Sequence, residues 1–528
     1  MKRVLALLLV LGLLLCGCSM TEDSPVAEIE RYYRSLNLMK YSEMEYQRPD
    51  LTAHAAVLEE SCKTALESQD LDQVLEAIYA YYDESNWFYT NYSLANIRYS
   101  KDLTDIYWEK EYNYCAEHTA EVDAGMDRLY HALADSPIRE ILEGEAYFGP
   151  GFFDAYEGES LWDDTFTAMM EQEAQLINDY YALSAETVSQ GAVDWEPMGD
   201  LLAELVLLRQ KIASYAGYES YNQFAYDFYY ARDYAPEQVE AYLEEIRREL
   251  VPLYVALDQD LWTAGYTACT EAETFEYLTQ CVDAMGGMVK SAYGMLDKYE
   301  LYDLSYSEKK YNASFEVFLS YYGQPFVFMN PQGSQADKLT LVHEFGHFAN
   351  DYACAGSYAG IDVAEIYSQA LEYLSLVYAP GGEKLAGYKL AETLCVFVEQ
   401  AAYATFENRL YEMAPGEVNE KNIRELFRQV GQEFGFGSWD FDSRIFVQIT
   451  HFYTSPHYVI SYVVSNDAAF QIYQKELAEA GKGLEQYQQS LSSLEGSFMM
   501  FLEAQGLESP FAEGRVAQIR QTLEEILK

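Results

Sequence analysis

The stretch SFEVFLSYYGQPFVFMNPQGSQADKLTLVHEFGHFAND, residues 314–351, combines two strand patterns with the start of a helix. Apolar residues alternate with others from Phe315 to Tyr321, and after a break at Gly323–Pro325 the run Phe326–Met329 is continuously apolar. This pattern predicts two short strands joined by a turn. Residues 334–337 have the Ser-x-x-Asp form of a helix N-cap, so we expect a helix to begin there.

The expected helix carries two histidines at a spacing that suits a metal ion. His343 and His347 are four residues apart, which places them on one helix face, where both imidazoles can reach one point. Glu344 follows the first histidine and could take a proton from a water molecule beside such an ion. Gly346, between the histidines, lets another segment approach closely. The alternative is a pair of ordinary helix histidines, and a third ligand would decide between the two.

Acidic candidates for that third ligand follow in GIDVAEIYSQALEYLSLVY, residues 360–378. If this segment is a helix, Glu365, Gln369 and Glu372 share one face, and a carboxylate there could complete a His-His-Glu zinc set. Asp362 could accept the outer N–H of a ligand histidine and fix its tautomer. The alternative is a solvated face in a very acidic protein, and the residues alone leave that choice open.

HEFGH followed by EIYSQALEY resembles the thimet oligopeptidase and oligoendopeptidase F family of zinc metallopeptidases, which carries HExGH and then E-x-P-S-Q-x-x-E. Tyr367 stands where that family has its usual proline. The segments 208–224 and 230–246 fit the family as well, and the resemblance covers roughly 205–500. It implies one zinc ion per chain and these roles: His343, His347 and Glu365 as ligands, Glu344 as general base, and Asp362 and Glu372 around them.

A second block, HFYTSPHYVISYVVSNDAA at residues 451–469, also resembles that family. Its members carry a histidine and paired tyrosines that face the metal from the opposite lobe, and the matching positions are His451, Tyr458 and Tyr462. A tyrosine hydroxyl could stabilise the oxyanion that forms on the scissile carbonyl. Which of the three donates stays open, and the alternative is two core tyrosines on a buried helix. We read His54, His118 and His131 as structural.

The N-terminus has the form of an export signal. Lys2 and Arg3 precede the apolar run Val4–Leu15, and the following Cys-Gly-Cys resembles the bacterial lipobox with Cys18 as the lipidated residue. Residues 1–17 are therefore a predicted signal peptide, with a simple secretory signal as the alternative. We expect an extracytoplasmic protein attached to the bacterial cell membrane through the lipid alone, because no later apolar run approaches about 18 residues.

Composition excludes one class of partner. The chain has 86 acidic and 34 basic residues and a formal net charge of −52, which argues against a nucleic-acid partner. The six cysteines after Cys18 form no C-x-x-C pair, and most of them read as small buried hydrophobes. In an exported protein the alternative is that some of them form disulfides, and the sequence leaves the pairing open. A polar break near 191–197 suggests a helical N-terminal region, 18–200, and a catalytic region, 201–528.

The resemblance implies a mainly α fold with two helical lobes around a deep active-site channel and a small β-hairpin beside the zinc-binding helix. It also implies a zinc-dependent endopeptidase that hydrolyses short oligopeptides. We expect Phe326–Asn330 to pair with the substrate backbone as an added strand. The alternative function is a catalytically silent, peptide-binding surface lipoprotein, which would have lost a ligand or the base. The sequence retains all of them. It does not indicate an oligomeric state.

Overall fold

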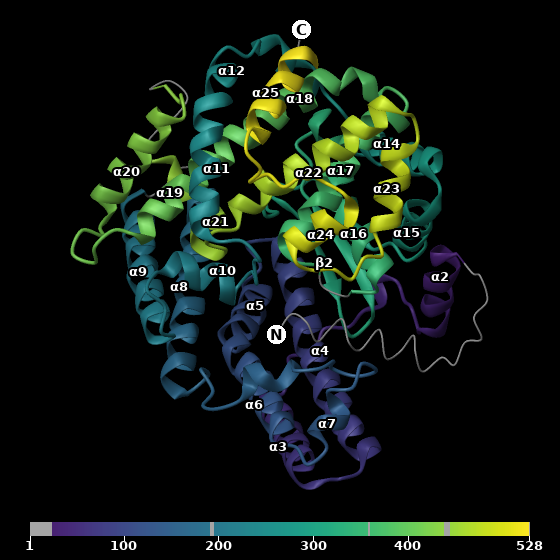
Figure 1. Cartoon of the computed structure of the whole chain (residues 1–528), viewed down its shortest axis with the longest axis vertical. Helices are drawn as coiled ribbons and strands as arrows, with labels where there is room; N and C mark the ends of the chain where they lie inside the picture. The colour runs from purple at the N-terminus through teal and green to yellow at the C-terminus, as the bar shows by residue number, and fades with distance from the viewer. Residues whose placement is uncertain (1–23, 191–194, 357–358, 438–443, 527–528) are drawn as a thin grey trace.

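The predicted hairpin and the helix after it lie side by side in a largely helical chain (Figure 1). The computed structural model describes residues 24–190, 195–356, 359–437 and 444–526. Strands β2 (Ser314–Leu319) and β3 (Gln324–Met329) form the hairpin, and helix α16 (Ala336–Cys354) packs against both. The prediction of a mainly helical fold with a small sheet beside the histidine helix is confirmed.

The hairpin belongs to a three-stranded sheet with the order β1-β3-β2. The short strand β1 (Tyr302–Asp303), which the sequence pattern missed, pairs in parallel with β3, while β2 runs antiparallel to β3. The turn falls earlier than expected, because Gln324 and Pro325 already belong to β3 and Pro325 lies opposite Phe318.

The position of β3 corrects one expectation. Residues 324–329 form the middle strand, with β1 on one side and β2 on the other, and each of them is buried. The segment Phe326–Asn330 therefore has no free edge for a substrate strand within the described sheet. The strands at the two ends of the order are β1, which has only two residues, and β2, which has six and is mostly half-buried.

The start of α16 differs in detail from the predicted cap. Gln335, rather than Ser334, occupies the N-cap position. The Asp337 carboxylate reaches back and accepts hydrogen bonds from the backbone N–H groups of Gln332 (3.0 Å), Gly333 (2.7 Å) and Ser334 (3.0 Å). The acid of the expected Ser-x-x-Asp pattern thus satisfies the backbone donors that precede the helix.

Helix α17 (Ile361–Tyr378) lies between α16 and α22 (Val459–Ala478) and is almost wholly buried. It meets α16 at Gly346, as the sequence suggested. A Cβ atom at Gly346 would lie 2.5 Å from Ser368 Cα and 2.8 Å from the Tyr367 carbonyl oxygen. Because both atoms belong to the backbone of α17, only glycine allows the two helices to come this close.

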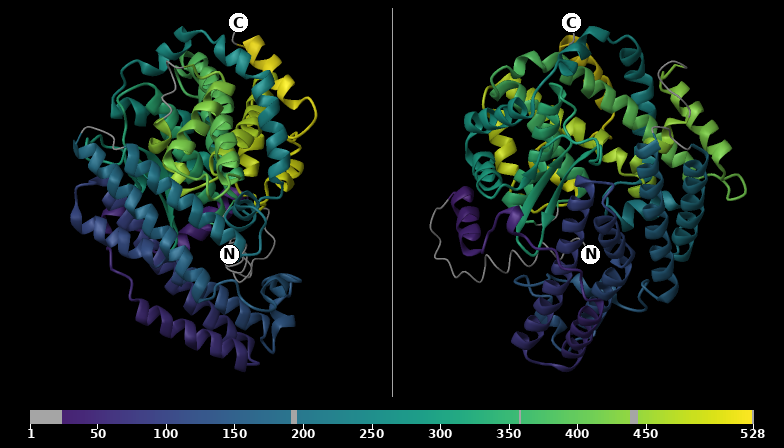
Figure 2. Two further views of the ribbon diagram at one scale, coloured as in Figure 1. Left: turned by 90° about the vertical axis from the view of Figure 1, so that its left-hand side faces the viewer. Right: turned by 180° about the vertical axis from the view of Figure 1, so that it is seen from behind.

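The remaining helices surround this centre, and the N-terminal ones α3–α7 gather at the lower end of the molecule (Figures 1 and 2). The N-terminal helices are α2 (Pro25–Ser35), α3 (Leu51–Glu67), α4 (Leu71–Lys101), α5 (Ile106–Glu117), α6 (Thr119–Ala134), α7 (Arg139–Leu142) and α8 (Asp164–Gln190). Those before the sheet are α9 (Trp195–Tyr215), α10 (Tyr221–Phe228), α11 (Pro236–Glu249), α12 (Val251–Val255), α13 (Thr263–Tyr266), α14 (Glu271–Met285) and α15 (Gly287–Lys298). The C-terminal helices are α18 (Ala386–Cys395), α19 (Ala401–Tyr411), α20 (Glu420–Glu433), α21 (Thr450–Thr454), α23 (Lys482–Ser490), α24 (Phe498–Gln505) and α25 (Arg515–Ile526).

Packing joins the N-terminal helices to the rest of the chain. One hydrophobic core extends from Ile29 to Leu523, and a smaller core lies among α3, α4, α6 and α7. Thr90 in α4 accepts a hydrogen bond from the backbone N–H of Tyr321 in the hairpin turn (2.9 Å). The division at residue 200 and the channel between two lobes stay predictions.

Three further sequence predictions concern the export signal, membrane-spanning segments and the cysteines. The signal peptide 1–17 and Cys18 lie outside the described residues. Among the described helices, none has the length and apolar character needed to cross a membrane. The six described cysteines are free thiols and all but Cys395 are buried, which agrees with their reading as small core residues.

We expect Gly346→Ala to lower the free energy of unfolding by about 1–3 kcal/mol, because the new methyl group would push α16 and α17 apart. Urea unfolding at constant m-value measures this change. Gly294→Ala in α15 is the matched control: its Cβ would meet open space among the described residues, so it should raise stability by about 0.5–1 kcal/mol. Equal changes in the two variants would contradict the close helix contact.

Candidate metal centre

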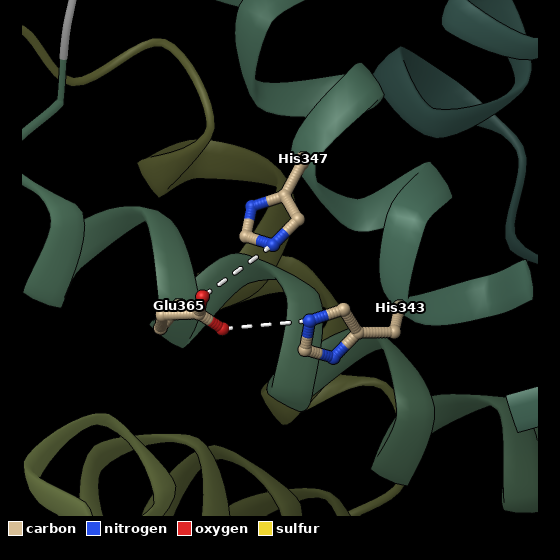
Figure 3. A group of neighbouring side chains, drawn as sticks. All are labelled: His343, His347 and Glu365. Carbon is tan, nitrogen blue, oxygen red and sulfur yellow. Dashed lines mark ion pairs between the residues drawn. The ribbon is translucent and has the colours of Figure 1, made fainter. Parts of the chain in front are cut away.

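His343 and His347 on α16 and Glu365 on α17 point toward one another (Figure 3). His343 Nε2 lies 3.4 Å from Glu365 Oε2, and His347 Nε2 lies 3.8 Å from Glu365 Oε1. One ligand atom from each of the three residues falls within 4.8 Å of the others. The buried carboxylate thus presents a different oxygen to each imidazole.

This arrangement fits a zinc ion. Two ligand atoms about 2.1 Å from one tetrahedral zinc lie about 3.4 Å from each other, close to the two separations observed. Burial and the nearby charge of His343 hold the pKa of His347 well below its usual range, so that imidazole is neutral and can act as a ligand. Two imidazoles and one carboxylate are also a donor set typical of catalytic zinc.

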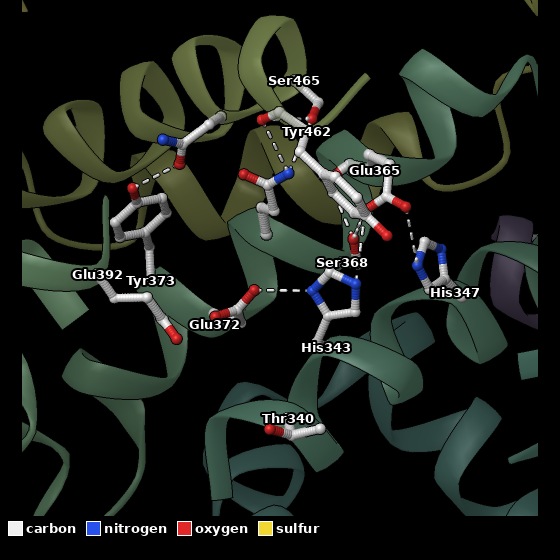
Figure 4. A network of polar contacts seen from close by, with 12 residues as sticks. Thr340, His343, His347, Glu365, Ser368, Glu372, Tyr373, Glu392, Tyr462 and Ser465 are labelled. Carbon is white, nitrogen blue, oxygen red and sulfur yellow. Dashed lines mark hydrogen bonds and ion pairs between the residues drawn. The ribbon is translucent and has the colours of Figure 1, made fainter. Parts of the chain in front are cut away.

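Glu372 fixes the orientation of His343. Its Oε1 lies 2.8 Å from His343 Nδ1, on the side of the ring away from Glu365 (Figure 4). A proton on Nδ1 would leave Nε2 free to bind a metal, which is the usual effect of a carboxylate behind a ligand histidine. Glu372 therefore lies directly behind a candidate ligand, in agreement with its predicted place around the ligands.

Lys389 holds Glu372 in turn and was missed in the sequence. Its buried ammonium group donates to Glu372 Oε2 (2.6 Å) and to Glu392 Oε2 (3.1 Å). The available signal was a single lysine within the apolar pattern of α18. Because Glu372 lies on the neighbouring helix α17, and only Glu392 lies within α18, the folded chain is needed to identify the role of Lys389.

The expectation for Asp362 is wrong. Its carboxylate accepts hydrogen bonds from Ser461 Oγ (2.5 Å), Tyr234 Oη (2.9 Å) and Arg232 Nε (3.2 Å). These partners come from the segment before α11 and from α22, so the carboxylate serves side chains other than the ligand histidines. Asp362 lies in the first turn of α17, which is turned toward those elements.

Burial changes the pKa of Glu344, the acid that follows His343 in the sequence. It raises the pKa of Glu344 to about 7, with the positive charge of His343 opposing the shift and the charges of Glu365 and Glu372 adding to it. Glu344 belongs to the same helix turn as His343 without being one of the three converging groups. A carboxyl group with this pKa can accept and release a proton near neutral pH.

His451, Tyr458 and Tyr462 also come together. Tyr458 donates a hydrogen bond to Glu365 Oε1 (2.7 Å), and Tyr462 Oη lies 3.3 Å from His451 Nε2. The two tyrosine rings are 5.3 Å apart. Burial lowers the pKa of His451 to about 4, so its imidazole is neutral at neutral pH. The block at 451–469 therefore faces the converging ligands, as the sequence predicted.

The other three histidines have local partners. His54 Nε2 lies 3.0 Å from Tyr81 Oη, His118 Nδ1 lies 2.7 Å from the Tyr114 carbonyl oxygen, and His131 Nε2 lies 3.4 Å from an Asp127 oxygen. Each contact lies within the N-terminal helices, which agrees with a structural role.

Comparison with known proteins identifies related sequences and folds. A model of the peptidase M3 N-terminal domain matches residues 41–160, and a model of peptidase family M3 matches residues 288–500. The second match contains the converging ligands and the tyrosine block. Among curated proteins, none matches the chain in sequence.

Solved structures share the fold at low sequence identity. PZ peptidase A with an inhibitor has a TM-score of 0.82 and 20% identity, with 92% of this chain and 99% of that chain covered. A protein from Bacillus anthracis str. Ames assigned to oligoendopeptidase F has a TM-score of 0.78 and 21% identity, with 93% and 98% covered. Oligoendopeptidase-F from Enterococcus faecium has a TM-score of 0.60 and 14% identity, with 96% and 98% covered.

We expect zinc affinity to rise about tenfold for each pH unit between about pH 6 and pH 8. Burial alone would lower the pKa of His343, but the Glu372 hydrogen bond and the charges of Glu365, Glu372 and Glu344 raise it to about 9. Zinc must therefore displace a proton throughout this range, and the competition weakens as pH rises. Titration against a chelator of known affinity at several pH values measures the slope.

Glu372→Gln should flatten this slope, since it removes the carboxylate that retains the proton on His343. Glu392→Gln is the control: that carboxylate also binds Lys389, but the hydrogen bond and the main charges that raise the His343 pKa come from Glu372, Glu365 and Glu344, so the slope should change less. A wild-type affinity that does not change with pH would refute the assignment of His343 as a ligand.

Proposed function

Because the chain belongs to peptidase family M3, we propose that it is a zinc-dependent endopeptidase that hydrolyses short oligopeptides. The convergence of His343, His347 and Glu365 carries this proposal. Glu344 stands beside that group, and Tyr458 faces it from α22 through its bond to Glu365. A ligand set, a base and a hydroxyl donor are the parts that metal-assisted hydrolysis of a peptide bond uses.

His343, His347 and Glu365 would hold the ion. When bound, zinc supplies Lewis-acid chemistry, which polarises a peptide carbonyl and makes a water molecule easier to deprotonate. Glu344 takes the proton from the attacking water and passes it to the leaving amine. A pKa of about 7 suits both transfers, because the group is neither a strong acid nor a strong base at neutral pH.

A tyrosine hydroxyl stabilises the negative charge that develops on the carbonyl oxygen. Tyr458 and Tyr462 are the candidates that the geometry favours, since each places its hydroxyl beside the ligand group or its neighbour His451. Neutral His451 brings no positive charge to the reaction, and its Nε2 lies within reach of the Tyr462 hydroxyl. We assign His451 the role of orienting that hydroxyl.

Short peptides are the proposed substrates, and the outer edge of β2 replaces Phe326–Asn330 as the place where a peptide backbone would pair. The alternative, a silent peptide-binding protein, requires the loss of a ligand or the base. The converging His343, His347 and Glu365 together with Glu344 favour the enzyme over that alternative. The net charge of −52 argues against nucleic acid as a partner.

Glu344→Gln should lower kcat by about 10²–10⁴-fold while zinc binding is kept, because an amide cannot accept the proton from water. A quenched fluorescent oligopeptide assay together with metal analysis of the same preparations tests this. Glu476→Gln, which changes a buried carboxylate bound to Tyr378 and Gly481, should leave kcat unchanged. Equal turnover by wild type and Glu344→Gln would refute the proposed base.

We also propose that Cys18 is lipidated and anchors the protein to the outer face of the cell membrane. Cys18→Ser should then move the protein from the membrane fraction to the soluble fraction, since the lipid is the proposed attachment. Fractionation followed by immunoblotting measures this change, with Cys62→Ser in the core as the control. Retention of Cys18→Ser in the membrane would contradict the anchor.

A further inference from the structure

We propose that Arg232 is a positioning residue that fixes the tyrosine block relative to the ligand helix α17. The proposal rests on the proposed function, because it concerns the placement of Tyr458 and Tyr462 in that reaction. Arg232 itself lies in the segment between α10 and α11, and its side chain is fully buried. Its partners belong to α17 on one side and to the start of α22 on the other.

The guanidinium group bonds to both elements at once. Arg232 Nε donates to Asp362 Oδ2 (3.2 Å), in the first turn of α17. Arg232 Nη2 donates to the His457 carbonyl oxygen (2.9 Å) and to Ser461 Oγ (3.0 Å). His457 directly precedes Tyr458, and Ser461 directly precedes Tyr462. The planar fork of arginine can satisfy a carboxylate and a carbonyl together, which the single ammonium of lysine cannot reproduce.

Asp362 also accepts hydrogen bonds from two of the elements that Arg232 connects. Its Oδ1 accepts from Ser461 Oγ (2.5 Å), and its Oδ2 accepts from Tyr234 Oη (2.9 Å). Both Asp362 and Ser461 are buried. The first turn of α17 is therefore joined to α22 directly through Ser461 and indirectly through Arg232, within a region where unpaired charges are costly.

The turn before α22 depends on side chains for its shape. His457 has a φ of +61°, a left-handed conformation that is uncommon for residues other than glycine. Its N–H donates to Glu407 Oε1 (2.9 Å), and the carbonyl oxygen of Pro456 accepts from Tyr230 Oη (2.6 Å). Together with the bond from Arg232, these contacts hold the backbone that leads into Tyr458.

A second buried arginine holds the other end of the same segment. Arg209 in α9 donates from Nη1 to the Phe452 carbonyl oxygen (3.0 Å) and from Nη2 to the Tyr453 carbonyl oxygen. Its Nε donates to Glu173 Oε1 (2.6 Å). The segment from His451 to Tyr458 is thus bound by an arginine at each end, and each arginine is paired with a carboxylate.

The bond between Tyr458 and Glu365 spans the same gap that Arg232 bridges. Glu365 lies three residues after Asp362, so a change at Asp362 shifts the distance between the ligand helix and the tyrosine hydroxyls. A misplacement of about 1 Å at a reacting group can lower a rate by about 100-fold. Arg232 would therefore act on turnover through the tyrosines rather than through contact with the substrate.

Arg232→Lys tests this, because it keeps the charge and loses the fork. We expect an unchanged zinc content, a KM within about twofold and a kcat about 100-fold lower. In a Tyr458→Phe/Tyr462→Phe background the same substitution should change kcat by less than about threefold, since the hydroxyls that it misplaces are absent. Ser461→Ala provides a second, milder variant if Arg232→Lys does not fold, with a smaller kcat loss that also disappears in the double-tyrosine background.

Arg515→Lys is the matched control. Arg515 is a buried arginine that binds Asp467 of the same helix α22 (Nε to Oδ1, 3.0 Å), away from the turn at Pro456–Tyr458. The Arg515→Lys variant should lose about as much stability in thermal unfolding as Arg232→Lys does, while its kcat stays within about twofold of the wild-type value. Equal kcat losses for Arg515→Lys and Arg232→Lys, or an equal loss for Arg232→Lys in both tyrosine backgrounds, would overturn the positioning role.

The two proposals fail in different ways. A wild-type protein that cleaves no peptide with zinc present would refute the proposed function itself. An active wild type whose Tyr458→Phe/Tyr462→Phe variant turns over normally would refute the inference about Arg232 and the role given to the tyrosines, while the zinc-dependent peptidase activity itself would stand.

Discussion

The close backbone contact between α16 and α17 at Gly346 is the constraint on which the candidate metal centre depends. Helices usually pack with their axes about 8–10 Å apart, and the shorter end of that range needs small residues at the contact. A side chain at Gly346 would collide with the backbone of Tyr367 and Ser368. Because Glu365 lies in the same turn of α17, that contact brings its carboxylate to 3.4 Å from His343 and 3.8 Å from His347.

The second constraint is electrostatic. Glu344, Glu365 and Glu372 are buried within a few ångströms of the histidines in a chain that already has a net charge of −52. Burial raises the pKa of Glu365, whereas Glu372 keeps a lowered pKa because the charge of Lys389 and the contact with His343 outweigh its burial. A divalent cation among these groups would offset the remaining negative charge and lower the cost of burying three acids together.

Local patterns in the sequence predicted the parts of the fold that depend on short-range order. The alternation from Phe315 to Tyr321 predicted β2, and the spacing of His343 and His347 predicted that both imidazoles reach one point. The choice of Glu365 as their partner came from the resemblance to a peptidase family and not from its spacing. Other features depend on contacts between distant segments, so no local pattern reveals them. The central position of β3 requires β1, which has only two residues, and Lys389 meets Glu372 from the next helix. Asp362 was expected to bind a ligand histidine. It binds Arg232 instead, which lies 130 residues earlier in the chain, so no local pattern could identify this partner.

The two acids on α17 that flank Glu365 explain why this helix organises the site. Glu372, toward the C-terminal end, orients His343 and is held by Lys389. Asp362, in the first turn, binds Arg232 and so connects to the tyrosine block. Ligand orientation and tyrosine placement therefore have separate determinants on one rigid element. Since α17 lies between α16 and α22, a shift of this helix would disturb both, whereas a change at either acid disturbs only one.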